Sequence, residues 1–402
     1  MHDIAWFLPA WPPAFGDLAV FGVLLLAGLA GGELAHRVAA LPRVTGYVLV
    51  GVLAGPAALD LVRAPLLSGM RAIVDLALGF IVFELGHRFD LDWLARNRWL
   101  ALAALGESLG AFFAIYAGLL YLDFAPLLAA CAAAVGTATS PAVVLAVSQE
   151  LRASGQITER MLLFTAANCV FAYVALMLFM PLVHLEHAAG WRSAILHPLY
   201  LLGGAALLGF VASQALLRAA KWLGKREDRQ FILLVGTVVL TVGVARALHL
   251  PVVVALLVLG ALARNLDDDH ALLPMRFGYA GQLLFVVLFV ITGASLDFGG
   301  LKTVAAVAAV FVVVRFLGKA VTILALGRLS GLRAGGAGLL SLSLLPMSGL
   351  AVVMVYDTVV LYPQFGADLA AVVLSAVAVL ELLGPLGTQF ALKRAGETHP
   401  EA

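Results

Sequence analysis

The 402-residue sequence has few charged side chains: only 12% of its residues are Asp, Glu, Lys or Arg, whereas 63% are hydrophobic. Water-soluble globular chains carry about 25% charged and 45–50% apolar residues, so this chain has too few polar side chains to cover a surface that faces water. The composition excludes an ordinary soluble domain and predicts a protein that lies within a lipid bilayer.

Cysteine is nearly absent, which excludes disulfide frameworks and cysteine-based metal sites. Cys131 and Cys169 both lie inside apolar runs, so the sequence contains no disulfide framework and no CxxC metal motif. Phosphate-binding GxGxxG and P-loop patterns are also missing, and no pair of histidines at metal-ligand spacing shares a predicted span. We therefore expect no cofactor, no metal beyond a transported monovalent cation, and no nucleotide hydrolysis.

An excess of positive charge is missing too. The formal net charge is +1, and the basic residues are scattered along the chain. Nucleic-acid-binding proteins gather Lys and Arg on one face or stripe, so we expect no nucleic acid as a partner.

Long apolar runs dominate what is present. A helix that crosses about 30 Å of hydrocarbon needs roughly 20 mostly apolar residues, and the positions of charges and of Pro/Gly clusters divide the chain into about thirteen such spans. The predicted fold class is therefore an all-α polytopic membrane protein. The predicted spans lie near 17–36, 42–59, 69–87, 97–122, 125–148, 159–183, 193–217, 230–248, 251–265, 278–296, 302–327, 334–357 and 367–392.

Basic residues orient these spans, because the loops on the cytoplasmic side of a membrane are enriched in Lys and Arg. With the N-terminus outside, eighteen of the 25 Lys and Arg residues fall in inside segments and five in outside segments. One missed span would scramble this asymmetry in every later loop. We expect an integral inner-membrane protein with its N-terminus outside and its C-terminus in the cytoplasm.

The sequence contains an internal repeat. Residues 37–54 align with residues 246–263 at a constant offset of 209, with identities at seven of eighteen positions. Further landmarks recur in the same order with a small drift of the offset: Gly86, Asp90 and Leu94 match Gly293, Asp297 and Leu301, and Pro141 matches Pro346.

This repeat predicts how the chain is organised. Equivalent spans are seven crossings apart and so run in opposite directions through the membrane, which is the inverted-repeat architecture of secondary transporters. We predict a single transmembrane transporter domain over 1–402, with repeat one at about 17–185, a linking helix at about 193–217 and repeat two at about 230–394.

Two predicted spans are interrupted halfway, in repeat-equivalent places. Proline removes a backbone donor and clashes with the preceding turn, and nearby hydroxyls can satisfy the carbonyls that it frees or bind a cation. A simple proline kink is the alternative at either place, but the matched positions favour two discontinuous helices that cross beside a site. The first interruption contains Gly136, Thr137, Thr139, Ser140 and Pro141, and the second contains Pro346, Ser348 and Gly349.

Four charged residues fall near mid-depth in predicted spans: Glu107, Arg315, Lys319 and Glu381. Ionisable groups inside a membrane mark functional sites by default. The alternative is that Arg315 and Lys319 pair with the two glutamates and merely neutralise a buried network. For Arg315 this alternative is favoured, and for Lys319 both interpretations stay open.

Five segments together resemble the monovalent cation:proton antiporters, the superfamily of Kef-type proteins and sodium/hydrogen exchangers. The segment 41–56 is similar to the family's second-helix signature, and 139–145 is similar to its first unwound helix. Residues 289–297, 315–319 and 381–385 also look like family segments. The resemblance covers nearly the whole chain.

The resemblance implies a thirteen-helix fold with a dimerisation domain and a mobile six-helix core that moves like an elevator. In the family the sixth helix carries an Asn-Asp or Asp-Asp pair, whose second carboxylate binds the proton and the cation in turn. Here Asn168 matches the first position, but Cys169 replaces the Asp. A thiol buried among apolar groups stays mostly neutral and is a weak ligand for Na⁺ or K⁺.

A relocated carboxylate would restore the exchange. Glu107 is placed to take this role on a core helix, or Glu84 from a facing helix, and Lys319 would then compete with the cation as a positive charge. We expect a transporter, not an enzyme, that exchanges Na⁺ or K⁺ for protons as a lipid-embedded homodimer.

Two other functions stay open because of Cys169. One is an uncoupled or altered-substrate carrier, and the other is a regulatory membrane subunit with a vestigial site. Thr139, Ser140, Asn168 and Lys319 argue against full decay, since a dead site has no reason to keep mid-membrane polar groups that each cost free energy.

Overall fold

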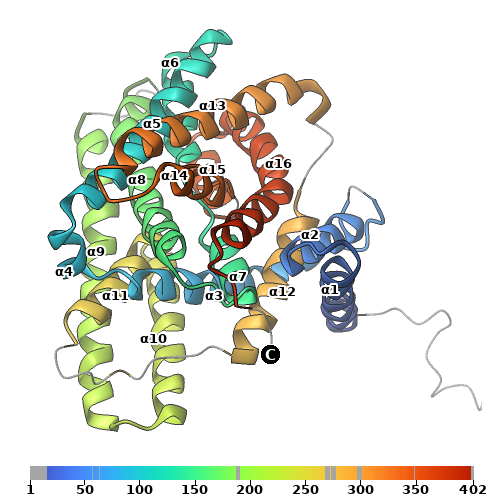
Figure 1. The fold of residues 1–402 in the computed structure, drawn as a ribbon, viewed down its shortest axis with the longest axis vertical. Helices are drawn as coiled ribbons and strands as arrows, with labels where there is room; N and C mark the ends of the chain where they lie inside the picture. Colours follow the sequence, from blue (N-terminus) through green and yellow to red (C-terminus); the bar gives the residue numbers. More distant parts are fainter. Residues whose placement is uncertain are drawn as a thin grey trace, which may run out of the picture.

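The computed structural model describes residues 16–399 apart from positions 57, 63, 187–190, 268–271, 273–277, 297–300 and 348. Over this part of the chain the structure is all-helical, with no strand (Figure 1). The helices are α1 (Asp17–Ala39), α2 (Arg43–Ala54), α3 (Ala64–His87), α4 (Leu91–Arg96), α5 (Arg98–Tyr121), α6 (Pro126–Gly136), α7 (Pro141–Glu150), α8 (Gln156–Glu186), α9 (Trp191–Leu223), α10 (Glu227–Ala247), α11 (Val252–Asn265), α12 (Gly278–Ala294), α13 (Leu301–Gly327), α14 (Ala334–Ser343), α15 (Gly349–Leu361) and α16 (Pro363–Ala395).

These helices follow the predicted spans closely. Each predicted span overlaps one helix, except that 125–148 and 334–357 are each divided into two helices, and the short α4 lies outside every predicted span. Among the described residues, eight helical segments are long and apolar enough to cross a membrane, and four shorter apolar helices accompany them. The polytopic all-α fold is thus confirmed, while the number of crossings stays a prediction.

Proline and glycine account for the two divided spans. Helix α6 ends at Gly136, and Pro141 begins α7, where its missing N–H is one of the donors that a helix start leaves unused anyway. The hydroxyl of Ser140 caps α7 by accepting a hydrogen bond from the backbone N–H of Val143 at 3.3 Å. Helix α14 ends at Ser343 and α15 begins at Gly349; Ser348 lies outside the described residues.

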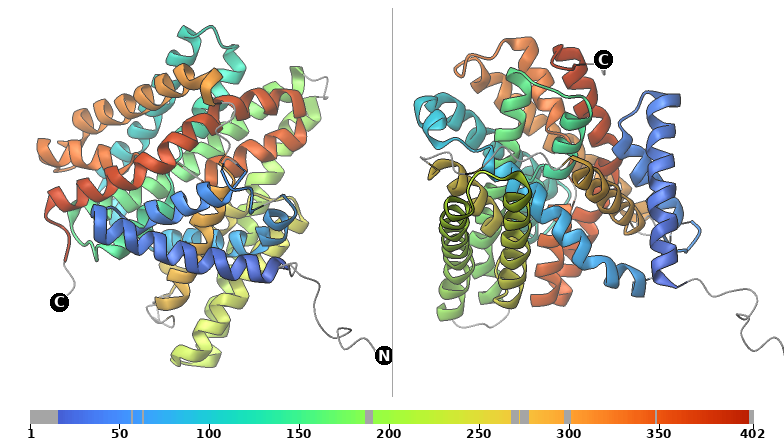
Figure 2. Two further views of the ribbon diagram at one scale, coloured as in Figure 1. Left: turned by 90° about the vertical axis from the view of Figure 1, so that its right-hand side faces the viewer. Right: turned by 90° about the horizontal axis from the view of Figure 1, so that it is seen from below.

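The helices form two bundles. The first, here called the site bundle, consists of α5–α8 and α13–α16, which pack mainly on one another. The second, the flanking bundle, consists of α1–α3 and α9–α12. In the right-hand view of Figure 2, α1 lies at one end of the flanking bundle and the α9–α10 hairpin at the other, with α3 between them. The bundles meet through α8 against α9 and through α7 and α16 against α2 and α3.

Close helix crossings recur in the two halves of the sequence. A Cβ added to Gly51 of α2 would lie 2.1 Å from the Val290 carbonyl oxygen of α12, and one added to Gly260 of α11 would lie 2.3 Å from the Phe83 carbonyl oxygen of α3. Gly51 and Gly260 are equivalent in the predicted repeat, and so are Phe83 and Val290. Only glycine permits such an approach of two backbones, so the same crossing supports the predicted repeat.

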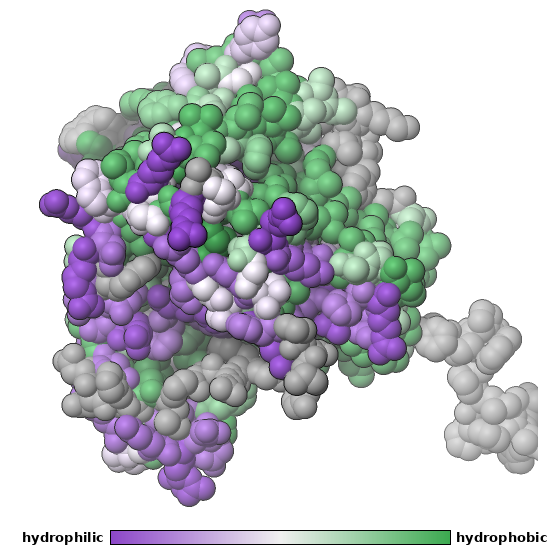
Figure 3. All heavy atoms as spheres, viewed as in Figure 1, coloured by the Kyte–Doolittle hydropathy of each residue, from purple (hydrophilic) through white to green (hydrophobic). Residues whose placement is uncertain are grey.

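Apolar side chains cover much of the surface. Figure 3 shows broad hydrophobic areas beside a hydrophilic region on the same face. Many large hydrophobic side chains are exposed; Leu240 of α10 is 67% exposed and Phe113 of α5 is 60% exposed. Surfaces that face water rarely carry so many exposed apolar side chains. These faces suit lipid.

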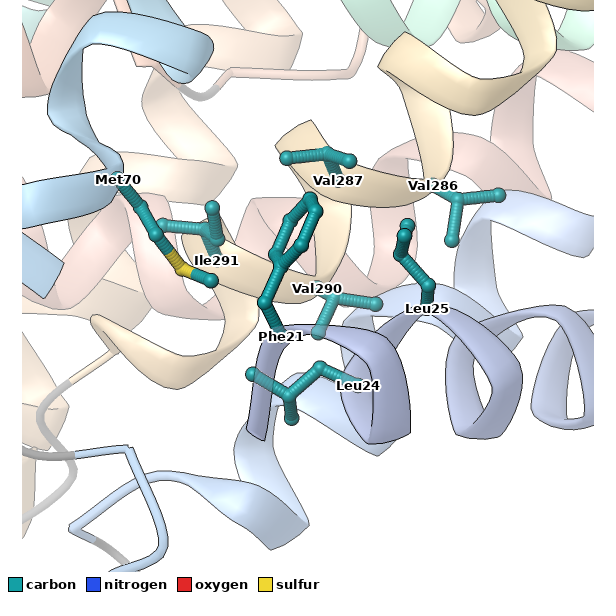
Figure 4. A pocket seen from close by; sticks show the side chains of 8 residues that line it. All are labelled: Phe21, Leu24, Leu25, Met70, Val286, Val287, Val290 and Ile291. Carbon is teal, nitrogen blue, oxygen red and sulfur yellow. The ribbon is translucent and has the colours of Figure 1, made fainter. Parts of the chain in front are cut away.

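An apolar pocket lies between α1, α3 and α12 (Figure 4). All eight side chains that line it are apolar, including Phe21, Met70 and Val290, and its volume is about 10 Å³. A cavity of this size and character holds at most one water and offers it no hydrogen-bond partner. It is a packing gap in the flanking bundle rather than a ligand site.

Candidate functional site

The two helix breaks lie against each other inside the site bundle. The backbone N–H of Ser140 donates to the Pro346 carbonyl at 3.0 Å, and the Thr139 hydroxyl lies 3.5 Å from the Leu344 carbonyl. Backbone groups that leave a helix inside a membrane must find partners in the protein. Here the first break supplies hydrogen-bond donors to backbone carbonyls of the second break.

Arg315 of α13 binds both breaks at once. Its buried guanidinium donates to the carbonyl oxygens of Gly136 at 2.7 Å, Ala138 at 2.8 Å and Leu345 at 2.8 Å, with a longer contact of 3.4 Å to that of Pro346. The carbonyl ends of α6 and α14 carry partial negative charge, which a cation stabilises. Among the described residues, the hydrogen bonds of Arg315 go to backbone carbonyls and none goes to a glutamate. This residue therefore compensates two helix ends, contrary to the alternative that the sequence favoured.

Lys319, one turn further along α13, forms a buried ion pair with Glu107 of α5. The two side chains are 1% and 0% exposed. The ammonium also donates to the Thr137 carbonyl and to the Thr139 hydroxyl, each at 3.2 Å. A buried charge is tolerated only when it is paired and hydrogen-bonded, and this pair meets that condition.

Asn168 of α8 joins the same network. Its amide nitrogen donates to Glu107 Oε1 at 3.3 Å and to Thr139 Oγ1 at 3.0 Å. Its amide oxygen accepts from the Ser108 hydroxyl at 2.7 Å. All of these side chains are fully buried. Sequence reasoning missed Ser108, although a serine next to Glu107 in a long apolar run is a usable signal.

Cys169 lies beside this network and contacts the backbone of Thr139. Its thiol donates to the Thr139 carbonyl at 3.5 Å and is fully buried. We call Glu107, Lys319, Asn168, Thr139 and Ser108 the buried cluster.

Glu107 has spare binding capacity. Lys319 and Asn168 both donate to Oε1, whereas Oε2 is buried without a hydrogen-bond partner among the described residues. A buried carboxylate oxygen without a partner costs free energy. Together with the Thr139 hydroxyl and the carbonyls of the break, it offers the hard oxygen ligands that alkali cations use in discontinuous helices.

Other predicted residues lie elsewhere. Glu84 of α3 accepts from Gln149 of α7 at 3.1 and 3.2 Å and pairs with Arg88 at 3.0 Å, on the surface and outside the buried cluster. Glu381 is fully buried in α16. Gly349 is the first residue of α15.

A second polar group, here called the Glu150 cluster, joins the two bundles at the end of α7. Both carboxylate oxygens of Glu150 accept from the backbone N–H of Arg43, at 3.0 and 3.2 Å, so the carboxylate also sits at the start of α2. Arg43 Nη1 lies 3.5 Å from Glu150 and Nε lies 3.2 Å from Glu33, and His36 Nδ1 lies 3.2 Å from Glu150.

A cavity of about 510 Å³ opens between the bundles. Its wall includes Leu85 and His87 of α3, Leu162 and Leu163 of α8, and Arg264 of α11. Leu163 precedes Asn168 by five residues in α8, which is about 7.5 Å along a helix. The cavity therefore approaches the buried cluster from one end of α8.

Comparisons with known proteins agree on one family. A sequence model described as "Sodium/hydrogen exchanger, transmembrane" matches residues 21–394. The chain is 26% identical over 294 residues to K(+) efflux antiporter 2, chloroplastic, of Arabidopsis thaliana; the match covers 68% of this chain and 24% of that protein. The chain thus spans about a quarter of the length of this relative.

Solved structures have the same fold. Two structures of the sodium proton antiporter MjNhaP1 from Methanocaldococcus jannaschii superpose with TM-scores of 0.68 and 0.70 at 14% identity. They cover 94% and 96% of this chain and 95% and 99% of their own.

Proposed function

The chain belongs to the sodium/hydrogen exchanger family, and from this premise we propose that it exchanges a monovalent cation, Na⁺ or K⁺, for protons at Glu107. The family is one of multi-span membrane transporters and not of enzymes. K⁺ is the first cation to test, because the relative with 26% identity is named a K(+) efflux antiporter.

The buried Glu107–Lys319 pair is the observation that supports this proposal. An antiporter needs one group that binds either the proton or the cation, and a single carboxylate with a free oxygen meets this need. A cation that binds the Glu107 carboxylate takes the place of the Lys319 ammonium there. A proton on Glu107 removes the negative charge that attracts both the cation and Lys319. In this proposal, Glu107 of α5 takes the role that the family pattern gives to the position of Cys169 on α8.

Alternating access would come from motion of the site bundle along the flanking bundle, as in an elevator. The two bundles meet over limited contacts, and the cavity lies between them. We further propose a lipid-embedded homodimer in an inner membrane, with the N-terminus outside and the C-terminus in the cytoplasm, because eighteen Lys and Arg residues then face the cytoplasm.

Cys169 is the observation that favours a second candidate, a carrier that has lost proton coupling or a regulatory subunit with a vestigial site. The thiol stands where the family pattern has a carboxylate, and it donates to the Thr139 carbonyl at 3.5 Å. This candidate predicts that no cation dissipates a pH gradient.

Proton flux in proteoliposomes tests the proposal. We expect Na⁺ or K⁺ to dissipate an imposed pH gradient, Glu107→Gln to abolish this response, and Cys169→Ala to keep most of it. Glu84→Gln is the matched control, since it removes a carboxylate of α3 outside the buried cluster. Full exchange in Glu107→Gln would refute Glu107 as the carrier, and a silent wild-type protein that is folded would favour the second candidate.

A further inference from the structure

We propose that Ser108 is a positioning residue for the exchange: its hydroxyl orients the Asn168 amide so that the amide donates to Glu107. This inference rests on the proposed role of Glu107. It assigns to Ser108 control over how readily a cation displaces a proton there.

The geometry fixes the amide from both ends. A carboxamide carries an acceptor oxygen on one side and a donor NH₂ group on the other, so fixing one end fixes the other. Ser108 donates to Asn168 Oδ1 at 2.7 Å, the shortest hydrogen bond that Asn168 makes. The two amide protons then face Glu107 and Thr139.

The opposite orientation of the amide would change which form of Glu107 is favoured. A turned amide would place its oxygen against the carboxylate, where two acceptors repel, unless Glu107 carries a proton that it can donate. Hydrogen bonds that are donated to a carboxylate favour its charged form. By holding the amide as a donor, Ser108 favours the form of Glu107 that binds a cation.

Full burial makes this contact effective. Ser108, Asn168 and Glu107 are each 0% exposed, so these side chains contact one another and other protein groups rather than the surface. A turned amide could donate to the Ser108 oxygen, but the serine proton would then be left with the Ala104 carbonyl at 3.2 Å in place of Asn168 Oδ1 at 2.7 Å. The shorter bond therefore favours the amide as a donor to Glu107. A serine that only satisfied its own helix would not reach across to α8.

Lys319 contacts Glu107 directly, and Arg315 and Cys169 are the further charged and titratable groups that interact with this pair. Other titratable groups on helices that pack on α5 include Tyr173 of α8 and Cys131 of α6. A substitution at Ser108 alters none of them. A changed pH profile in such a variant would therefore report on Glu107 through the amide.

The test compares Ser108→Ala and Ser108→Cys with the wild type in proteoliposomes. Loss of one hydrogen bond in a buried site corresponds to about a fivefold to tenfold effect. We expect the cation KM to rise by this factor and the pH profile of exchange to move upward by about half to one pH unit, with a smaller change in the maximal rate. Ser108→Cys keeps the side-chain size but is a weak donor, so it separates the hydrogen bond from the cavity.

Ser341→Ala is the matched control. Ser341 is also fully buried in the site bundle, but its hydroxyl donates to Ala337 of its own helix at 2.8 Å. We expect its KM and pH profile to match the wild type.

Unchanged KM and pH profile in both Ser108 variants, with Glu107→Gln inactive, would overturn this inference alone. Activity in Glu107→Gln would instead refute the proposed function, and the role of Ser108 with it. If Ser108→Ala does not fold, Ser108→Cys decides.

Discussion

The buried cluster and the Glu150 cluster are both built around a carboxylate and a cation, yet one is fully buried and the other is partly exposed. Glu107 and Lys319 lie within one bundle and are no more than 1% exposed. Glu150 and Arg43 belong to different bundles, and their side chains are 8% and 28% exposed at the edge of the structure. The Glu107–Lys319 pair is buried inside the site bundle, whereas the Glu150–Arg43 pair connects the site bundle to the flanking bundle.

This difference sets what each pair can do. In a low-dielectric interior, a lone charge is costly and salt screens little, so the buried pair must stay matched throughout. At a partly exposed boundary, a pair contributes less than a buried one and is weakened by salt. The buried cluster suits chemistry that changes one charge at a time, and the Glu150 cluster suits a contact that forms and breaks.

Removal of Lys319 should have the largest effect. Lys319→Met leaves the Glu107 charge buried without its partner, which costs about 3–5 kcal/mol of stability, and exchange should be lost. The double variant Glu107→Gln with Lys319→Met should regain most of the thermal stability but no transport. Thermal unfolding in detergent and flux assays check both statements. A double variant as unstable as the single one would contradict the charge argument.

Arg315→Met should rank second in its effect on exchange, because it acts on the fold rather than on the exchanged ion directly. The substitution leaves the Gly136, Ala138 and Leu345 carbonyls of the two breaks without their donor. Each unsatisfied buried group costs about 1–3 kcal/mol, so the melting temperature should fall by roughly 5 °C or more. Arg328→Met, which replaces an exposed arginine at the end of the same stretch of chain, is the control and should melt like the wild type.

Glu150→Gln should have a smaller effect of the opposite kind. Weakening a contact between bundles should increase the exchange rate, by about twofold to fivefold if the contact contributes up to about 1 kcal/mol. Choline chloride, which is no substrate, should speed the wild type but not this variant, because salt screens the intact cluster. If salt changed the exchange rate of both proteins equally, the Glu150 cluster would not control that rate.

Arg37→Ala should have the smallest effect. Arg37 pairs with Glu33 on the surface of α1 and its side chain is 76% exposed. Such i,i+4 surface pairs contribute little. We expect neither the melting temperature nor the exchange rate to change measurably, and a clear loss of transport would extend the Glu150 cluster to Arg37.

The sequence predicted the family and the helix breaks well, because both depend on local chemistry. Pro141 and the adjacent hydroxyls mark a helix interruption wherever they stand in an apolar run, and the family match confirms the resemblance that these segments carry. The helix boundaries followed from the lengths of apolar runs in the same way.

Pairing between distant residues could not be predicted. Glu107 and Lys319 are 212 residues apart, and nothing in the helical period says whether Lys319 or Arg315 faces Glu107. The rotation of α13 against α5 decides this, and it depends on packing such as the close approach of Gly110 and Gly318. Ser108 escaped notice for the same reason, since its importance lies in a contact with another helix.

The reach of Arg315 also has a consequence for how the protein is made. The ribosome delivers α6 and α7 to the membrane long before α13 exists, so the carbonyls of Gly136 and Ala138 must wait about 180 residues of synthesis for their donor. Until Arg315 is inserted, the N-terminal half carries these carbonyls without the donor that they have in the folded protein. The first helix break is therefore completed only after the C-terminal half of the protein has been inserted.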